Sequence, residues 1–246
     1  ETGTLADALR LMRTLQCDRL SVVDSDHSKV GWVTLEDVVS RLSPERLYID
    51  LNDSHRDQNI LRHKARYLFA LNLIRPGGKV LDCACGAGYG ASILAEKANQ
   101  VLGVDNSIEA IEFADSHYAC ERACFLLQDL QELNFGRRSL DSVVSLETLE
   151  HIPKESAEEI LLKINRWLRP GGVLVASSPM LRYQNGHPYI TSPYHVNELP
   201  RDELLATFGR CLPDMTLSFY HQKEQAFTHL EDEVAGFCLM VAKKNE

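Results

Sequence analysis

The sequence has no long run of apolar residues. None of its hydrophobic stretches approaches the roughly 18 consecutive apolar residues that a membrane-spanning helix needs. Its first residues also lack the basic and then apolar pattern of a secretory signal segment. We therefore expect a soluble, cytoplasmic protein that does not contact a membrane.

Basic residues are scarce relative to acidic ones. The 26 Lys and Arg residues stand against 35 Asp and Glu residues, which gives a formal charge of −9. Such a chain repels a polyphosphate unless its basic residues cluster strongly. The composition therefore disfavours extended nucleic acid as a partner, but it leaves open a short nucleic-acid end or loop.

Paired cysteine motifs are missing, although cysteine itself is not. The seven cysteines have neither the density of a disulfide scaffold nor the paired CxxC spacing of a zinc site. We expect buried free thiols in a reducing compartment, at Cys17, Cys83, Cys85, Cys120, Cys124, Cys211 and Cys238.

The length and composition are those of an ordinary globular protein. A chain of 246 residues suits one large α/β unit with an appendage, or two modest domains. With 44% hydrophobic and 25% charged residues it can bury a core, which argues against disordered, collagen-like and coiled-coil classes.

Residues 4–42 have the pattern of a helix, two short strands and a second helix. Thr34 is placed to cap the second helix, with Asp37 at its third position in a capping-box arrangement. Residues 19–38 resemble part of one cystathionine-β-synthase-type (CBS) repeat. Such repeats pair to make an adenosyl-nucleotide site, whereas a single partial copy implies a packing or dimerisation piece. We therefore expect residues 1–43 to be a partial CBS-like segment and a possible homodimer contact, with nucleotide binding as the alternative.

Ser43-Pro44 marks the boundary, because the residue before a proline is pushed out of the helical region. Residues 44–246 then alternate strand and helix, which predicts a parallel, doubly wound sheet with helices on both faces. The expected helices are 62–73, 91–98, 108–119 and 154–168, and the expected strands are 79–82, 101–105, 125–129, 142–146, 173–177, 216–219 and 237–241.

A glycine-rich turn follows the first strand of this region. Gly86 and Gly88 let the backbone approach a ligand closely, and the helix that begins after them supplies oriented N–H donors. Asp105 lies about twenty residues further on, where a carboxylate accepts hydrogen bonds from ribose hydroxyls. This motif alone leaves NAD and S-adenosylmethionine as rival ligands.

The neighbouring residues favour S-adenosylmethionine. Asp82 would repel a pyrophosphate but can meet a cationic amino-acid group. With Gln128-Asp129-Leu130, the pattern resembles the class I S-adenosylmethionine-dependent methyltransferases, which have a Rossmann-like, mostly parallel seven-stranded sheet. The segments that carry the resemblance are 45–47, 66–70, 80–94, 103–107 with 109–111, 140–152 and 168–175. The resemblance implies that the methionine side meets Asp82, Gly86 and Gly88, the ribose meets Asp105 and Asn106, and the adenine meets Asp129 and Leu130. We also expect Glu147 and Ala84 to belong to the cofactor site. Ala84 stands where many members of the family have a glycine.

The reacting side of the pocket is expected after the fourth strand, at Glu147-Thr-Leu-Glu150-His151. One helical turn would present Glu147, Glu150 and His151 to the same point. This pattern resembles the metal motif of small-RNA 3′-terminal ribose methyltransferases and a run in polyphenol O-methyltransferases, and His195 would complete that set. We favour the alternative without a metal, in which His151 is the general base and His195 the second choice.

These observations predict an S-adenosylmethionine-dependent enzyme that methylates an oxygen of a small hydroxylated acceptor, such as a sugar or polysaccharide precursor. Residues 178–195, rich in Pro, Tyr and His, are expected to cover the pocket as a long loop. Two alternatives stay open: a metal-assisted RNA 3′-end or polyphenol O-methyltransferase, and a non-catalytic regulatory protein that binds S-adenosylmethionine or another adenosyl nucleotide.

Overall fold

The computed structural model describes residues 57–190, 192–233 and 235–246 of the large unit. Before them it describes residues 8, 11, 12, 14, 15, 17, 19–34, 37, 38 and 46–49. The chain divides into two compact units, Glu1–Asp53 and Ser54–Glu246. The expected boundary after residue 43 stays a prediction, because residues 39–45 lie outside the described residues.

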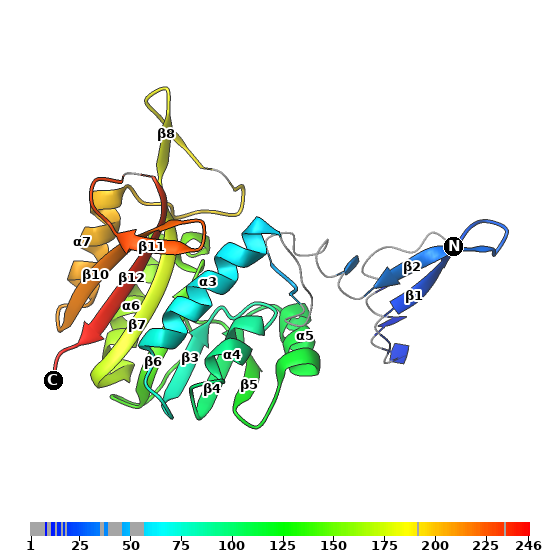
Figure 1. Cartoon of the computed structure of the whole chain (residues 1–246), viewed down its shortest axis with the longest axis horizontal. Coiled ribbons are helices and arrows are strands. Elements are labelled where there is room, and N and C mark those ends of the chain that lie inside the picture. Colours follow the sequence, from blue (N-terminus) through cyan, green and yellow to red (C-terminus); the bar gives the residue numbers. More distant parts are fainter. Residues whose placement is uncertain are drawn as a thin grey trace. The chain divides into compact units, whose positions relative to one another are not determined.

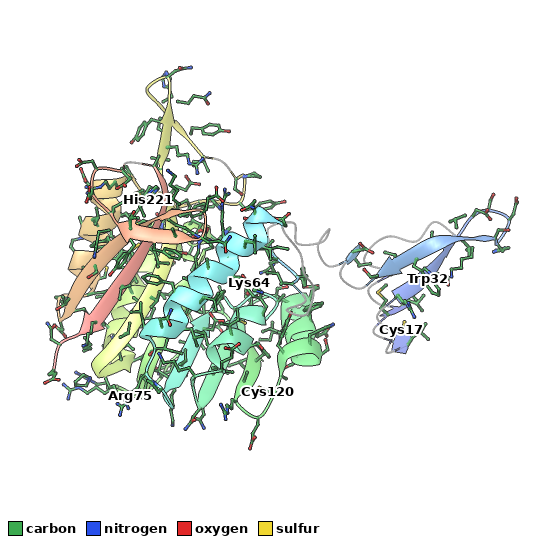
Figure 2. The ribbon with its side chains drawn as sticks, in the orientation of Figure 1. Cys17, Trp32, Lys64, Arg75, Cys120 and His221 are labelled. Atoms are coloured by element: carbon green, nitrogen blue, oxygen red, sulfur yellow. The ribbon has the colours of Figure 1, made fainter. Side chains whose placement is uncertain are left out.

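The N-terminal unit contains an antiparallel hairpin. Its strands are β1 (Arg19–Val23) and β2 (Lys29–Thr34), as predicted. The exposed Trp32 lies on β2 (Figure 2), with the Lys29 ammonium 3.4 Å from the centroid of its ring. Beyond β2, the N–H of Thr34 donates to Asp37 Oδ2 at 2.9 Å and the N–H of Asp37 donates to Thr34 Oγ1 at 3.1 Å, which confirms the capping pair. The expected flanking helices lie largely outside the described residues.

The large unit is built on an eight-stranded sheet (Figure 1). Its strand order is β11-β10-β12-β7-β6-β3-β4-β5. The pairs among β3 to β7 are parallel, and those involving β10, β11 and β12 are antiparallel. The strands are β3 (Lys79–Cys83), β4 (Gln100–Asp105), β5 (Ala123–Leu127), β6 (Leu140–Leu146), β7 (Leu168–Met180), β10 (Met215–Lys223), β11 (Ala226–His229) and β12 (Gly236–Lys244).

Helices cover both faces of this sheet (Figure 1). One layer contains α3 (Gln58–Leu73), α4 (Tyr89–Leu94) and α5 (Ile108–Tyr118), and the other contains α6 (Lys154–Trp167) and α7 (Arg201–Cys211). The main hydrophobic core joins α6 and α7 to alternate residues of the strands, including Leu81, Val143 and Leu174. The Rossmann-like, mostly parallel fold predicted from the sequence is therefore confirmed, with one strand more than expected.

The order of the strands reverses at β3, which is where open α/β sheets have their ligand crevice. β4 and β5 lie on one side of β3, whereas β6 and β7 lie on the other side. In open α/β sheets the ligand binds where the strand order reverses, outside the carboxyl ends of the two strands concerned. Here those strands are β3 and β6, whose ends carry Asp82 and Glu147.

Several elements differ from their expected bounds; α4, for example, covers Tyr89–Leu94 rather than 91–98. Helix α3 begins at Gln58 rather than at residue 62, because the Asp57 side chain accepts hydrogen bonds from the N–H groups of Asn59 and Ile60 at its N-terminus. The expected long loop at 178–195 is not structureless. β7 continues to Met180, and a small antiparallel hairpin follows, made of β8 (Arg182–Gln184) and β9 (His187–Tyr189).

No helix among the described residues is both long enough and apolar enough to cross a membrane. All seven cysteines are free thiols. The expectation that they are buried is wrong for Cys120 and Cys124, which are exposed. Cys124 lies on β5, the outermost strand of the sheet, and Cys120 (Figure 2) lies in the turn before it, so neither is covered by a further strand.

Candidate active site

The glycine-rich turn after β3 leaves open space at Gly86. Gly86 has a φ of +53°, and a Cβ built there would meet nothing within 4 Å. Gly88 is different, because a Cβ there would lie 2.5 Å from the Cβ of Ala114 on α5. The turn therefore offers room for a ligand at Gly86, whereas glycine at position 88 is required by the packing of α4 on α5.

Asp105 braces this turn from the end of β4. Its Oδ2 accepts a hydrogen bond from the N–H of Gly86 at 3.0 Å, and its Oδ1 accepts one from the N–H of Ser107 at 2.9 Å. Ser107 then caps α5 by accepting a hydrogen bond from the N–H of Ala110. Asp105 is thus held beside Gly86 at the carboxyl edge of the sheet.

Asp82 is a buried carboxylate on β3, facing α3. The Tyr67 hydroxyl donates to Asp82 Oδ1 at 3.2 Å. The Tyr67 ring packs on Gly90, because a Cβ built on Gly90 would lie only 2.0 Å from the Cζ atom of that ring. Burial raises the pKa of Asp82 to about 8, the hydrogen bond from Tyr67 opposes this rise, and the negative charge of Asp105 adds to it. A cation placed beside Asp82 would favour its ionised form.

Glu147 follows β6 in a left-handed conformation, with a φ of +51°. Its Oε1 accepts a hydrogen bond from the Ser177 hydroxyl at 2.6 Å and lies 3.3 Å from a guanidinium nitrogen of Arg66. The buried Arg66, on α3, also donates through Nε to Gln222 Oε1 on β10 at 2.6 Å. This network holds the end of β6 against α3 and the antiparallel side of the sheet.

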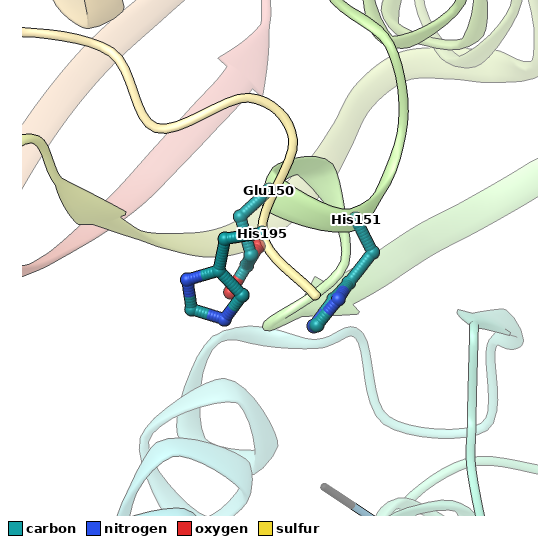
Figure 3. Close-up of side chains that lie close together, drawn as sticks. All are labelled: Glu150, His151 and His195. Carbon is teal, nitrogen blue, oxygen red and sulfur yellow. The ribbon is translucent and has the colours of Figure 1, made fainter. Parts of the chain in front are cut away.

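Three ionisable side chains converge just beyond β6. The short 3₁₀ turn η1 (Leu149–His151) supplies Glu150 and His151, and the segment after the β8–β9 hairpin supplies His195 (Figure 3). One ligand atom from each lies within 4.8 Å of the other two, and the imidazole rings meet edge to face with their centroids 4.9 Å apart. Burial raises the pKa of Glu150 well above its usual value, and the charge of Glu147 adds to the effect.

The segment that carries His195 is fastened to this turn by hydrogen bonds. The N–H groups of Val196 and Asn197 donate to the Glu150 carbonyl at 2.8 and 3.0 Å. The Asn197 side-chain amide donates to the Leu149 carbonyl at 3.2 Å. Thr148, which directly precedes the turn, shares its hydroxyl between the carbonyls of Cys83 at 3.3 Å and Leu146 at 3.2 Å. The residue before the turn is therefore hydrogen-bonded to Cys83, the last residue of β3, where the glycine-rich turn begins.

The sequence-based expectation for this cluster was partly wrong in its geometry. The structure does not place Glu147, Glu150 and His151 on one helical turn. The backbone of Glu147 is in the left-handed conformation, and η1 begins only at Leu149. The structure brings Glu150, His151 and His195 together, and it directs Glu147 to Arg66.

Residues expected around the adenosine lie at the ends of β4 and β5. Asn106 directly follows β4 and is exposed. Asp129 lies two residues beyond the end of β5 rather than on the strand, and its Oδ1 accepts a hydrogen bond from the N–H of Gln131 at 2.8 Å. Leu130 beside it is buried. Their contacts with a ligand stay predictions.

Sequence reasoning assigned no site role to Arg66, Tyr67, Ser177 and Gln222. One signal was present, because Arg66 lies on the buried face of an amphipathic helix, and a fully buried arginine needs a partner. The partners themselves come from strands distant in the sequence.

Residues 80–172 match a family model described as a methyltransferase domain, and residues 1–44 match one described as a CBS domain. A relative from Mycolicibacterium smegmatis, named "Probable S-adenosylmethionine-dependent methyltransferase", is 32% identical over 149 residues. The match covers 59% of this chain and 56% of the relative. The chain therefore contains a methyltransferase domain at residues 80–172. This relative is named for S-adenosylmethionine, which is one of the two ligands that the glycine motif alone left open.

Solved structures support the fold of this methyltransferase domain. A TehB-like S-adenosylmethionine-dependent methyltransferase from Corynebacterium glutamicum aligns with a TM-score of 0.56 and 19% identity, over 74% of this chain and 88% of its own. The 4+2 cyclase SpnF aligns with a TM-score of 0.62 and 16% identity, over 84% of this chain and 91% of its own. One protein with this fold is thus named for a different reaction, so fold alone does not establish activity. The chain spans about half the length of the curated relatives it matches.

Proposed function

We propose that the protein is an S-adenosylmethionine-dependent methyltransferase that methylates an oxygen of a small hydroxylated acceptor, such as a sugar or polysaccharide precursor. One observation carries this proposal: two imidazoles, His151 and His195, lie together beyond β6, and Thr148, just before the turn that holds His151, donates a hydrogen bond to the last residue of β3. Methylation of a hydroxyl requires loss of its proton, and imidazole is the side chain whose chemistry suits that task near neutral pH.

The residues around the crevice fit S-adenosylmethionine. The open space beside Gly86 would admit the ligand, and the buried carboxylate of Asp82 would meet its cationic methionine end. Asp105 with Asn106 would hold the ribose, and Asp129 with Leu130 would flank the adenine. When bound there, S-adenosylmethionine supplies an electrophilic methyl group on a positively charged sulfur.

The chain's own residues would contribute positioning and proton removal. The Glu150–His151–His195 cluster promotes loss of the acceptor's proton, while contacts around it orient the hydroxyl toward the methyl group. The β8–β9 hairpin and the segment after it carry exposed aromatic side chains at Tyr183, Tyr189 and Tyr194. Exposed aromatic rings of this kind suit the face of a sugar or a phenol, and we assign them to acceptor contacts.

Titration calorimetry with S-adenosylmethionine tests the cofactor site. We expect Asp105→Ala to weaken binding at least about tenfold, because a hydrogen-bonding carboxylate is lost. The matched control is Asp115→Ala, an exposed position on α5, which should bind like the unaltered protein. Binding of NAD without any binding of S-adenosylmethionine would overturn the assignment.

Transfer of a radiolabelled methyl group to a panel of acceptors tests the reaction. The panel contains sugars, phenols, primary amines and an RNA with a free 3′ end. Labelling of a sugar or another small hydroxylated compound supports the proposal. Labelling of only the amine or only the RNA contradicts it, and binding of S-adenosylmethionine without any transfer favours a regulatory protein.

A further inference from the structure

We propose that Glu150, His151 and His195 bind one divalent transition-metal ion on the acceptor side of the pocket. Two imidazoles and one carboxylate from separate segments of the chain each bring a ligand atom within 4.8 Å of the others (Figure 3). Convergence alone is common among ionisable side chains, so the proposal needs independent support from the surroundings of each ligand.

Glu150 gives the first support. Its side chain is fully buried, and neither carboxylate oxygen has a hydrogen-bond partner on another residue among those that the structure describes. A buried carboxylate is normally paired, hydrogen-bonded or bound to a metal. A cation between Glu150 and the two imidazoles would give these oxygens the partner that they lack.

The orientation of the imidazoles gives the second support. The ring nitrogen Nδ1 of His151 lies 3.3 Å from the Tyr194 carbonyl, and Nδ1 of His195 lies 2.5 Å from the carboxylate of the buried Glu198. Because a carbonyl and a carboxylate accept hydrogen bonds, Nδ1 is the donor in each ring, and Nε2 would be the nitrogen that binds the ion. Histidines that bind metals show this arrangement, with one nitrogen donating to a carbonyl or carboxylate and the other bound to the ion.

The third support is that the ligands are held in place before any ion binds. The Glu150 carbonyl accepts hydrogen bonds from Val196 and Asn197, the residues that directly follow His195. The two segments that carry the ligands are therefore joined next to the ligands themselves. Rigid placement of this kind is what a metal site requires of its supporting residues.

The ligand types indicate the class of ion. Magnesium and calcium prefer oxygen ligands only, whereas two imidazole nitrogens and a carboxylate suit zinc, manganese, cobalt or iron in the divalent state. Three protein ligands also leave coordination positions open, as in catalytic rather than structural zinc sites.

The role of the ion rests on the proposed function. An acceptor hydroxyl in an open position would become more acidic, because the ion withdraws electron density from its oxygen. The proton leaves to solvent, the new oxygen–carbon bond forms, and the sulfur–carbon bond breaks with its electron pair kept by sulfur. With the ion bound, the imidazoles promote loss of the proton by holding the ion, and without it they would do so as the bases of the proposed function.

Metal binding by the full-length chain tests the site directly. After dialysis against a chelator, the protein is titrated with Zn²⁺ by calorimetry and with Co²⁺ by visible absorption. We expect about one ion per chain, with binding at least about tenfold weaker in His151→Ala and in Glu150→Gln. His187→Ala, an exposed histidine on β9, is the matched control and should bind as the unaltered protein does.

His151 is exposed, so its variant keeps the proposal testable even if Glu150→Gln fails to fold. An unaltered protein that binds no more metal than His151→Ala overturns the site. Full methyl transfer by the chelated protein also overturns the metal proposal while the proposed function stands. Metal binding that depends on these residues, with no transfer to any acceptor, supports the site and contradicts the proposed function.

Discussion

Two residues at the candidate site adopt backbone conformations that are unfavourable for their side chains. Ala84 and Glu147 follow the neighbouring strands β3 and β6, with φ of +52° and +51°. A left-handed conformation costs a non-glycine residue about 1–2 kcal/mol, and such residues cluster at functional sites. For Glu147 the contacts with Arg66 and Ser177 oppose that cost, so the turn keeps its shape.

The pKa of Asp82 predicts how the stability of the protein depends on pH. This pKa is about 8 in the folded chain and 3.8 without burial, so the folded form keeps a proton that the unfolded form loses. The resulting stabilisation is complete below pH 4 and is lost as the pH rises toward 8, by up to about 1.4 kcal/mol per unit. Asp82→Asn should therefore gain stability relative to the unaltered protein across this range.

Urea unfolding at pH 5, 6.5 and 8 measures that difference. The stability of Asp82→Asn minus that of the unaltered protein should increase at each step. Asp115→Asn, on the exposed face of α5, is the control, and its difference should stay constant. A difference that is independent of pH in Asp82→Asn would mean that Asp82 is ionised in the folded protein.

Individual site residues were predictable where they follow a strand. Asp82, Gly86, Asp105 and His151 could be placed together because the carboxyl ends of parallel strands share one edge of a sheet. Arg66 could not be placed, because its partner Gln222 lies 156 residues away and no local pattern connects them. Such contacts depend on which strands become neighbours, and sequence periodicity does not report that order.

At the scale of elements, α3 holds the site together through Arg66. The guanidinium is buried between the end of β6 and β10, and it also lies over the ring of Phe237 on β12, with its carbon 4.3 Å from the ring centroid. Helix α3 thus joins the strand that carries Glu147 to the antiparallel part of the sheet. Loss of this link should affect the stability of the whole unit.

Arg66→Ala should lower the free energy of unfolding by about 3–5 kcal/mol, because it leaves Glu147 without its charged partner inside the protein. The control is Arg62→Ala, one turn earlier on α3, which removes an exposed ion pair with Glu224 and should cost about 1 kcal/mol or less. Chemical denaturation monitored by circular dichroism measures both. Equal losses in the two variants would show that burial of Arg66 has no special role.

Most elements were predictable from hydrophobic spacing, and their ends were less so. The strands β3 and β6 could be predicted because nearly all of their residues are buried, which gives short continuous apolar runs in the sequence. The short strands β8, β9 and β11 escaped detection because they are mostly exposed and carry no regular alternation of apolar residues. Hairpins of this kind form through backbone pairing, to which composition is a poor guide.

At the scale of the whole molecule, the described residues of the candidate site all belong to the unit Ser54–Glu246. That unit has its own sheet, two helical layers and a hydrophobic core. Residues 1–44, in the N-terminal unit, match a CBS domain. We propose that this unit mediates a homodimer.

This division predicts two separable effects of removing residues 1–53. The shortened chain should bind S-adenosylmethionine within about twofold of the full chain, because its cofactor residues and core are retained. It should also be monomeric by light scattering, whereas the full chain should be a dimer. A shortened chain that folds but loses cofactor binding would mean that the N-terminal unit completes the site. A shortened chain that remains dimeric would place the contact on the methyltransferase domain, where the exposed edge strand β5 offers unpaired backbone groups.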